Sequence, residues 1–215
     1  ATGGDKEAKI MASVLGQALD LLRAGKPARL TAPNDIEEQR VFDQAQLLTS
    51  KPILYVCNVA EQDASTGNLL TEMVFEKAKR DSSQAVLVSA AIEAELIMMA
   101  PDDRTEYLAS LGLTDSGLNR IISAGYRLLG LQTFFTAGPK ETRAWTFPTG
   151  AKAPQAAGEI HTDFEKGFIR AETISFDDYV NLGGEAPARE AGKMRQEGKE
   201  YLVKDGDIML FKFNV

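Results

Sequence analysis

The chain has 215 residues, 44% of them hydrophobic and 26% charged, which is ordinary for a soluble globular protein of one large or two modest domains. The formal net charge of −7 argues against a general nucleic-acid coat protein, because phosphate binding rests on Lys and Arg. The single cysteine, Cys57, excludes a disulfide framework and a cysteine-based metal site, and no apolar stretch approaches the roughly 20 residues that cross a bilayer.

The chain opens on Ala1 rather than on a Met, and no signal peptide is visible. We therefore expect a cytoplasmic protein with no membrane partner, and one that is a fragment, a processed product or the ordered part of something longer. Residues 5–24 place apolar side chains at helical spacing, which predicts an amphipathic helix that ends at Gly25 before Pro27. The pattern favours equally one arm of a helical hairpin and a plain surface helix.

Asn34 and Glu37 have the spacing of a capping pair, which predicts a helix over residues 35–48. The apolar run that follows, from Pro52, is typical of a strand covered on both faces, and it ends in a polar corner at Asn58 and Glu61. An amide and a carboxylate together offer donors and acceptors that suit the edge of a purine. As a bare pattern, Asn-x-x-Glu is more often a solvated corner between a strand and a loop.

Residues 68–80 predict a helix, and residues 85–88 predict a second buried strand. Strand, helix and strand at this spacing form a βαβ unit with parallel strands, so Asn58 and Ser89 should share one edge of the sheet. Two strands do not make a stable parallel sheet, and we expect its other strands to be absent from this sequence or to lie upstream of Ala1. Three further helices are expected, over 91–99, 101–111 and 115–131.

After Gly130 the sequence changes to short strand candidates separated by turn residues, which indicates a small α+β domain with a boundary near residue 131. Its expected hairpin, helix and returning strands cover residues 132–136, 143–147, 156–166, 168–172 and 208–213. Trp145, Phe134 and Phe135 are most simply explained as core residues of this domain.

Other polar residues carry weaker signals. His161 is the only histidine, so no histidine cluster for a metal can be built, and a structural or surface role is expected. Two pairs of carboxylates, Asp177 with Asp178 and Glu159 with Asp163, are far more simply solvated charge than catalytic acids. We therefore expect neither catalytic residues nor metal ligands in this chain.

The region 131–215 holds 11 of the 24 basic and 13 of the 31 acidic residues, so it is less acidic than the rest of the chain. Its basic side chains fit either an RNA-facing surface or a solvated mixed face, and the pattern alone leaves both open. The candidates for the RNA-facing surface are Lys140, Arg143, Lys152, Lys166 and Arg170.

Longer motifs carry a family resemblance. They are Gly4–Ala8, Gly25–Arg29, Lys51-Pro52, Gly130–Glu141, Arg143–Trp145, Lys152–Gly158, Ile160-His161, Asp163–Glu165, Gly167–Glu172, Glu197–Lys199, Asp205–Asp207 and Phe211–Val215. These segments closely resemble the YchF/Obg-like ATPases over essentially the whole chain. Several long matches at fixed spacing within about 80 residues do not arise readily by chance.

The resemblance implies an α/β fold with part of a P-loop NTPase parallel sheet and a helical coiled-coil arm, followed by an α+β TGS domain of β-grasp type. It implies three regions. Residues 1–34 would be one arm of the helical insertion, residues 35–130 the C-terminal half of the nucleotide-binding domain, and residues 131–215 the TGS domain.

The resemblance also implies a ligand and partners. In this family Asn-x-x-Glu stands where GTPases have Asn-Lys-x-Asp, so ATP is preferred and GTP is weaker. The implied cofactor-binding residues are Asn58, Val59, Glu61, Ser89 and Ala90, the last two through their backbone. Adenine shows an N6 donor and N1 and N7 acceptors, which the Asn amide and nearby backbone can meet. The intact parent would hydrolyse ATP with Mg and bind the ribosome or RNA through the TGS domain and the helical arm.

One departure limits the resemblance. The sequence has no Gly-x4-Gly-Lys-[Ser/Thr] phosphate loop and no magnesium-holding Asp-x-x-Gly ahead of the helical arm. Phosphoryl transfer depends on those groups to cradle the phosphates and to place the metal. We therefore expect this chain alone to bind nucleotide weakly, if at all, and not to hydrolyse it. The alternative is a non-enzymatic TGS-bearing module that docks on the ribosome or another regulator without nucleotide.

Overall fold

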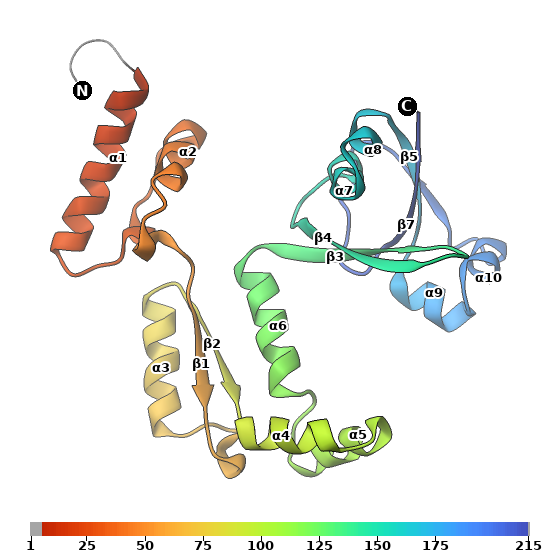
Figure 1. The fold of residues 1–215 in the computed structure, drawn as a ribbon, viewed down its shortest axis with the longest axis horizontal. Coiled ribbons are helices and arrows are strands. Elements are labelled where there is room, and N and C mark those ends of the chain that lie inside the picture. The colour runs from red at the N-terminus through yellow and green to blue at the C-terminus, as the bar shows by residue number, and fades with distance from the viewer. Residues whose placement is uncertain (1–5, 215) are drawn as a thin grey trace. The chain divides into compact units, whose positions relative to one another are not determined.

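The computed structural model describes residues 6–214, in a mixed α/β fold of two compact units that divide between residues 124 and 125 (Figure 1). Three residues of the family motifs, Gly4, Asp5 and Val215, lie outside the described residues. The division falls inside helix α6, whereas the sequence places the boundary after Gly130.

The first unit begins with a pair of helices. Helix α1 (Lys6–Arg23) packs against α2 (Ile36–Gln44), and two 3-10 turns, η1 (Ala28–Leu30) and η2 (Leu48–Ser50), flank α2. A small core of Val14, Ala18, Ala28 and Phe42 lies within this segment. The amphipathic helix that the sequence predicts over residues 5–24 is therefore confirmed for its described part.

The start of α2 corrects the expected capping pair by one residue. Asp35, not Asn34, caps the helix, and its Oδ1 accepts the Glu38 N–H at 2.8 Å. Glu38 rather than Glu37 reaches back, since its Oε2 accepts the Asn34 N–H at 2.7 Å. The helix ends at Gln44 rather than near residue 48, because Gln46 takes a positive φ of 47° that no helix continues through.

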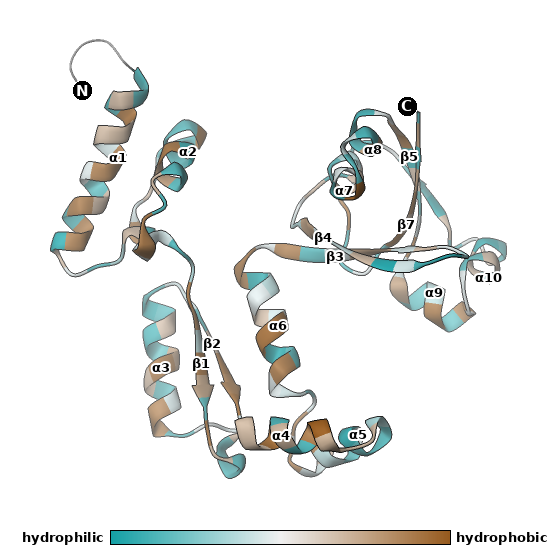
Figure 2. Cartoon of the chain, viewed as in Figure 1, coloured by the Kyte–Doolittle hydropathy of each residue, from teal (hydrophilic) through white to brown (hydrophobic). Residues whose placement is uncertain are grey.

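A βαβ unit follows. Strand β1 (Leu54–Asn58), helix α3 (Leu69–Arg80) and strand β2 (Gln84–Val88) form it, with a 3-10 turn η3 (Glu61–Asp63) after β1. The two strands pair in parallel, which confirms the prediction, and Asn58 lies opposite Val88. In Figure 2 both strands are mainly brown. The expectation of a strand buried on both faces is wrong for β1, because Val56 is 48% exposed and α3 is the helix that packs on this two-stranded sheet.

Three helices follow: α4 (Ala90–Met98) and α5 (Pro101–Ser110) belong to the first unit, and α6 (Gly117–Leu128) spans the division between the units. Helices α4 and α5 contribute side chains to a cluster in which Ala64, Ile92, Leu96 and Leu113 are buried. Helix α6 starts two residues later than predicted, at a glycine that touches the end of β2. A Cβ on Gly117 would lie 2.4 Å from the Val88 Cγ2 atom, so this contact requires a residue without a side chain.

The second unit is a five-stranded mixed sheet in the order β4-β3-β7-β5-β6, with four short helices. Its elements are β3 (Leu131–Ala137), β4 (Thr142–Pro148), α7 (Ala153–Ile160), α8 (Thr162–Lys166), β5 (Phe168–Ile174), α9 (Phe176–Leu182), α10 (Glu185–Glu190), β6 (Arg195–Glu197) and β7 (Ile208–Phe213). The antiparallel hairpin β3–β4 and the last strand confirm the predictions. The sequence did not predict α9, α10 or β6.

The core of the second unit lies between the sheet and helix α7. It holds Phe134, Phe147, Phe168, Met209 and Phe211, with alanines of α7 against them. Phe135 does not belong to this core, contrary to expectation, because neighbouring residues of a strand face opposite sides. Its ring instead lies 6.0 Å from Phe176 of α9.

The single helix expected over residues 156–166 is two helices. His161 separates α7 from α8 because its backbone is extended, with φ −164° and ψ 142°. Its Nδ1 atom accepts the Asp163 N–H at 3.2 Å, so the imidazole caps the start of α8. This exposed capping position fits the structural or surface role expected for the only histidine.

Candidate functional site

The carboxyl ends of β1 and β2 bring Asn58, Val59 and Ala90 together. Asn58 and Val88 are the last residues of their strands and lie opposite each other. The Val59 N–H donates to the Val88 carbonyl at 2.9 Å, and the Ala90 N–H donates to Asn58 Oδ1 at 3.0 Å. The expected meeting of Asn58 with the 89–90 segment at one edge of the sheet is therefore confirmed.

Asn58 caps a helix from a neighbouring strand. The N-cap residue of α4 is Ser89, whose own side chain makes no capping hydrogen bond. The side-chain oxygen Oδ1 of Asn58 accepts the Ala90 N–H at the start of the helix instead. The other half of the side chain, Nδ2, makes no hydrogen bond within the described part of the chain. Since Asn58 is exposed, it presents a free N–H donor at the edge of the sheet.

Ser89 contributes a buried polar atom. The residue is 2% exposed, and its hydroxyl has no hydrogen-bond partner among residues 6–214. Buried polar atoms in folded proteins are nearly always paired with protein or with water. An unpaired hydroxyl beside the Asn58 cap is thus an unused hydrogen-bonding group at the end of the sheet.

Glu61 lies in the loop that follows β1. Ala64 anchors this loop in the core, and Gly67 N–H donates to the Asp63 carbonyl at 2.7 Å. Asn68, the cap of α3, also donates to Asp63 Oδ2 at 2.8 Å. The Glu61 side chain itself is exposed and makes no hydrogen bond or ion pair within the described residues, so its carboxylate is available to a ligand.

Tyr107 of α5 lies close to this loop, a contact that no motif in the sequence predicts. Its hydroxyl donates to the carboxylate of Glu95 on α4. That hydrogen bond, with desolvation and the charges of Glu95 and Glu61, raises the pKa of Tyr107 to about 12. The Val59 side chain packs into the same apolar cluster as Tyr107. Valine has no polar side-chain atom, so only its backbone can form a hydrogen bond with a ligand.

A hollow of about 310 Å³ adjoins the site, between β1 and the start of α3. Asn58 and Val59 lie on its wall, while Glu61, Ser89 and Ala90 do not. Its remaining lining residues are Tyr55, Val56, Cys57, Asn68, Leu70, Thr71 and Val74. Desolvation raises the pKa of the Cys57 thiol, which is therefore protonated at neutral pH. A larger hollow of about 850 Å³ lies among α4, α5 and α6.

The five basic residues suggested as an RNA-facing surface fall into two groups. Lys152 pairs with Glu200, and Arg170 lies 3.9 Å from Glu172. The other three make no ion pair with any described residue: Lys140, Arg143 and Lys166. Only this second group therefore carries charge that the protein itself does not partly neutralise.

Residues 6–214 contain neither a metal-binding cluster nor a membrane-spanning helix. No group of three or more His, Cys, Asp or Glu side chains is arranged to hold a metal ion there. Within the same residues, no helix combines the length and the apolar composition that a membrane span requires.

Relatives and solved structures resemble the whole chain. A family model described as "YchF-GTPase_C: Protein of unknown function (DUF933)" matches residues 131–214. The "Ribosome-binding ATPase YchF" of Shigella flexneri is 52% identical over all of this chain and 59% of its own length. The protein of that name from Bacillus subtilis is 46% identical over 98% of this chain and 58% of its own length, and the "Obg-like ATPase 1" of Rattus norvegicus is 43% identical over 99% and 54%.

The solved structure of the Schizosaccharomyces pombe YchF GTPase superposes with a TM-score of 0.78 at 31% identity, over 99% of this chain and 58% of that one. The chain thus spans about three-fifths of the length of the curated relatives it matches. Identity of this level along the entire chain, together with the shared fold, establishes that the chain belongs to the YchF/Obg-like ATPase family.

Proposed function

We propose that this chain is the C-terminal portion of a YchF-like ATPase, which binds ATP in preference to GTP and associates with the ribosome in the cytoplasm. Support comes from the names of its relatives, which call the YchF proteins ribosome-binding ATPases and the rat protein an ATPase. Residues 35–130 would supply the base-reading half of a P-loop nucleotide domain, and residues 1–34 one arm of its helical insertion. The five-stranded unit would be the TGS domain, with α7 as the helix of a β-grasp.

The observation that carries the proposal is the hydrogen bond from the Ala90 N–H to Asn58 Oδ1. It holds the Asn58 side chain at the edge of the sheet where ligands of parallel α/β sheets bind. The free Asn58 Nδ2 is then a donor at this edge, the unpaired Ser89 hydroxyl lies one residue before Ala90, and the free Glu61 carboxylate lies in the turn that follows β1, so these segments offer both donors and acceptors. Such a set suits a purine base, whose edge also mixes donors and acceptors.

The same residues do not fit the phosphates of a nucleotide. The corner offers a carboxylate, an amide and a hydroxyl but no lysine or glycine-rich turn, and the sequence has no phosphate-loop motif. The chain's own contribution is therefore to bind and orient the base. Mg-ATP, when bound to the intact protein, supplies the phosphoryl group, and residues outside this sequence would hold it.

Calorimetry on the intact protein tests the site. The protein should bind ATP more tightly than GTP, and Asn58→Ala should weaken ATP binding by about 1–3 kcal/mol, because a polar partner of the base is left unmade. Asn119→Ala is the matched control, since Asn119 bonds to Asp115 on an exposed turn of α6. Equal affinity of wild type and Asn58→Ala would remove Asn58 from the site.

A second candidate is a non-enzymatic module that docks on the ribosome or another regulator without nucleotide. It is favoured by the second unit, which has a buried core of its own. The intact mass of the source protein separates the two candidates. A coding sequence that reaches upstream into a phosphate loop favours the ATPase, and a start codon at or near residue 1 favours the module.

A further inference from the structure

The hairpin β3–β4 carries a three-layer stack of side chains. The Trp145 ring lies parallel to within 15° of the Phe134 ring, with centroids 6.5 Å apart. On Trp145 the Arg143 guanidinium carbon lies 4.2 Å from the ring centroid. Phe134 is fully buried whereas Arg143 is exposed, so the stack leads from the core of the unit to its surface.

Two contacts hold the middle layer in place. The Trp145 Nε1–H donates to the Thr136 hydroxyl across the hairpin at 2.9 Å, and Phe134 supports the ring from below. A tryptophan fixed in this way orders the arginine that lies over it, because a cation is attracted to the ring face. The guanidinium thus becomes a flat, positively charged surface before any ligand arrives.

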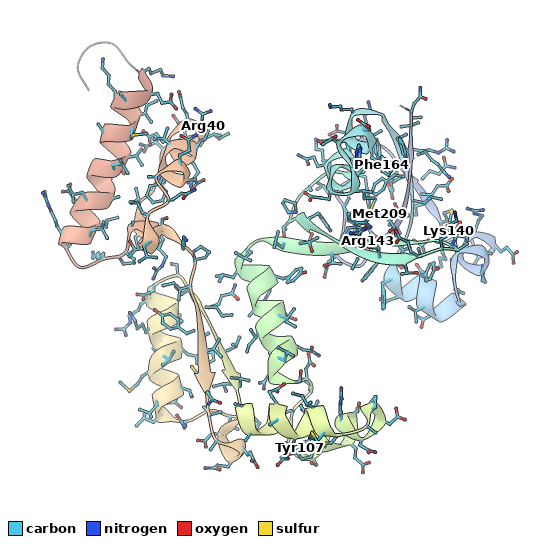
Figure 3. All side chains as sticks on the ribbon, in the orientation of Figure 1. Arg40, Tyr107, Lys140, Arg143, Phe164 and Met209 are labelled. Atoms are coloured by element: carbon cyan, nitrogen blue, oxygen red, sulfur yellow. The ribbon has the colours of Figure 1, made fainter. Side chains whose placement is uncertain are left out.

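The two cations of this hairpin, Lys140 and Arg143, make no ion pair with a described residue, although Glu141 lies between them in the sequence. Elsewhere in the second unit most cations face carboxylates, as at Glu172, which has Arg170, Arg189 and Lys212 within 4 Å. Arg143 and Lys140 have no such partner among the described residues. Figure 3 labels both residues, which belong to β4 and to the turn that precedes it. β4 is also an edge strand of the sheet, so another molecule can approach it.

We propose that Arg143 on Trp145, together with Lys140, is a contact for an unpaired nucleotide of RNA. The base would stack on the outer face of the guanidinium, and Lys140 would meet a neighbouring phosphate. Flat arginine surfaces and aromatic rings are the groups on which proteins stack unpaired RNA bases, and free cations attract the backbone. This proposal deepens the ribosome association proposed above and rests on it.

The first experiment measures RNA binding by the full 215-residue chain. Fluorescence anisotropy follows a labelled single-stranded 12-nucleotide oligouridylate and the same strand in a duplex with oligoadenylate. Arg143→Lys keeps the charge and removes the flat surface, so affinity for the single strand should fall about fivefold or more. Lys140→Ala should weaken binding less and should lower the slope of log affinity against log salt by about 0.7.

Trp145 provides a direct readout because it is the only tryptophan in the sequence. Its fluorescence should change with RNA and saturate at the same concentration as the anisotropy. Lys199→Ala is the matched control, because Lys199 is also exposed and makes no ion pair with a described residue, and its turn follows β6, at the opposite edge of the sheet from β4. It should bind single strands much as wild type does and leave the tryptophan signal intact.

Sedimentation with ribosomes separates this proposal from the broader one. If the wild-type chain does not sediment with ribosomes, the proposed function fails for this portion. If it sediments and Arg143→Lys sediments and binds RNA equally well, ribosome association stands and the hairpin contact is overturned. Loss of ribosome binding with oligouridylate affinity unchanged would assign the hairpin to a protein partner and also overturn it. Equal affinity for duplex and single strand would exclude stacking.

Discussion

The two units bury their apolar residues very differently, although both contain a sheet with helices against it. In the second unit five strands enclose a core in which Phe134 and Phe147 are fully buried. In the first unit two strands carry one helix, α3, on which Leu69 and Leu70 are 73% and 71% exposed. Both units have buried clusters, but the five paired strands of the second unit bury large aromatic side chains, whereas the two strands of the first leave their own helix largely exposed.

The exposed apolar side chains of the first unit have a physical explanation. A parallel sheet needs cover on both faces, and exposed apolar surface of this kind marks a place where other protein packs. Leu69, Leu70 and Met73 on α3, with Val56 on β1, are such a surface. This contrast agrees with the proposal that the first unit is part of a larger nucleotide domain, whereas the second unit is a folding unit of its own.

The largest expected effect comes from separating the two regions at the boundary that the sequence predicts. Residues 131–215 alone should show a cooperative thermal transition by circular dichroism, because their core lies entirely within them. Residues 1–130 alone should melt without a sharp transition and bind a hydrophobic dye. A random-coil spectrum for residues 131–215 would contradict the comparison.

Single substitutions in the two units should lower the free energy of unfolding by amounts that differ severalfold. Phe134→Ala should cost about 3–5 kcal/mol, because a fully buried ring that touches Trp145, Phe147 and Phe211 leaves a cavity. Leu70→Ala should cost less than about 1 kcal/mol, since its side chain is mostly exposed. Urea unfolding of the full chain measures both, and equal costs would show that α3 is covered.

The second unit should also lose stability at high pH. Burial and a hydrogen bond to Asp207 at 2.7 Å raise the pKa of Tyr201 from 10.0 to about 12. Because the folded-state pKa is raised, the stability that the protonated Tyr201 hydroxyl contributes is fully present below pH 10 and is lost as pH rises toward 12. Tyr201→Phe should flatten that decline of the melting temperature, and Tyr179→Phe should leave it as in wild type.

The smallest expected effect lies in the first unit at low pH. The Asp81 carboxylate accepts from Lys77 at 2.8 Å and from the Tyr55 hydroxyl at 3.3 Å, and Arg29 is 3.7 Å away. The Lys77 hydrogen bond is the main cause that lowers the pKa of Asp81 below 3.8. The stability that the ionised Asp81 carboxylate contributes is therefore present above about pH 4 and is lost as pH falls below that value.

Asp81→Asn tests this contact through the melting temperature at pH 6 and pH 3. The variant should have a lower melting temperature than wild type at pH 6. Its melting temperature should fall less than that of wild type between pH 6 and pH 3. Asp20→Asn changes an exposed carboxylate of α1 that makes no ion pair with residues 6–214, so its melting temperature should match that of wild type at both pH values. An Asp81→Asn curve identical to wild type would show that the 28–30 segment is not tied to α3 through this residue.

Regular local patterns in the sequence were enough to predict the βαβ unit and the β3–β4 hairpin. Apolar runs and turn residues fix such elements, and parallel pairing then places Asn58 beside Ala90 without further information. Helices α9 and α10 lie in a segment of short elements, where no period is long enough to be recognised. The extended backbone of His161 divides a stretch that is otherwise helical in pattern.

The parts of the site that the sequence missed depend on tertiary packing. Tyr107 reaches the Glu61 loop because α5 folds back on α4, and no spacing along the chain records that contact. The unpaired hydroxyl of Ser89 likewise follows from burial, which one short polar residue after a strand does not reveal. The exposed face of β1 was missed because an apolar run looks the same whether neighbouring strands are present or absent.

The Asn58 cap fixes the polarity of the corner. Rotating an asparagine amide by 180° exchanges its oxygen and its NH₂ group with little change of shape. Here the Ala90 N–H needs an acceptor, so the oxygen faces Ala90 and the NH₂ group faces outward. The outward group can serve only as a donor, and the N7 atom of either purine accepts from a donor. Asn58 would then grip ATP and GTP alike, and the preference for adenine would fall to Glu61 and the backbone around it. Asn58→Ala should lower both affinities and leave their ratio nearly unchanged.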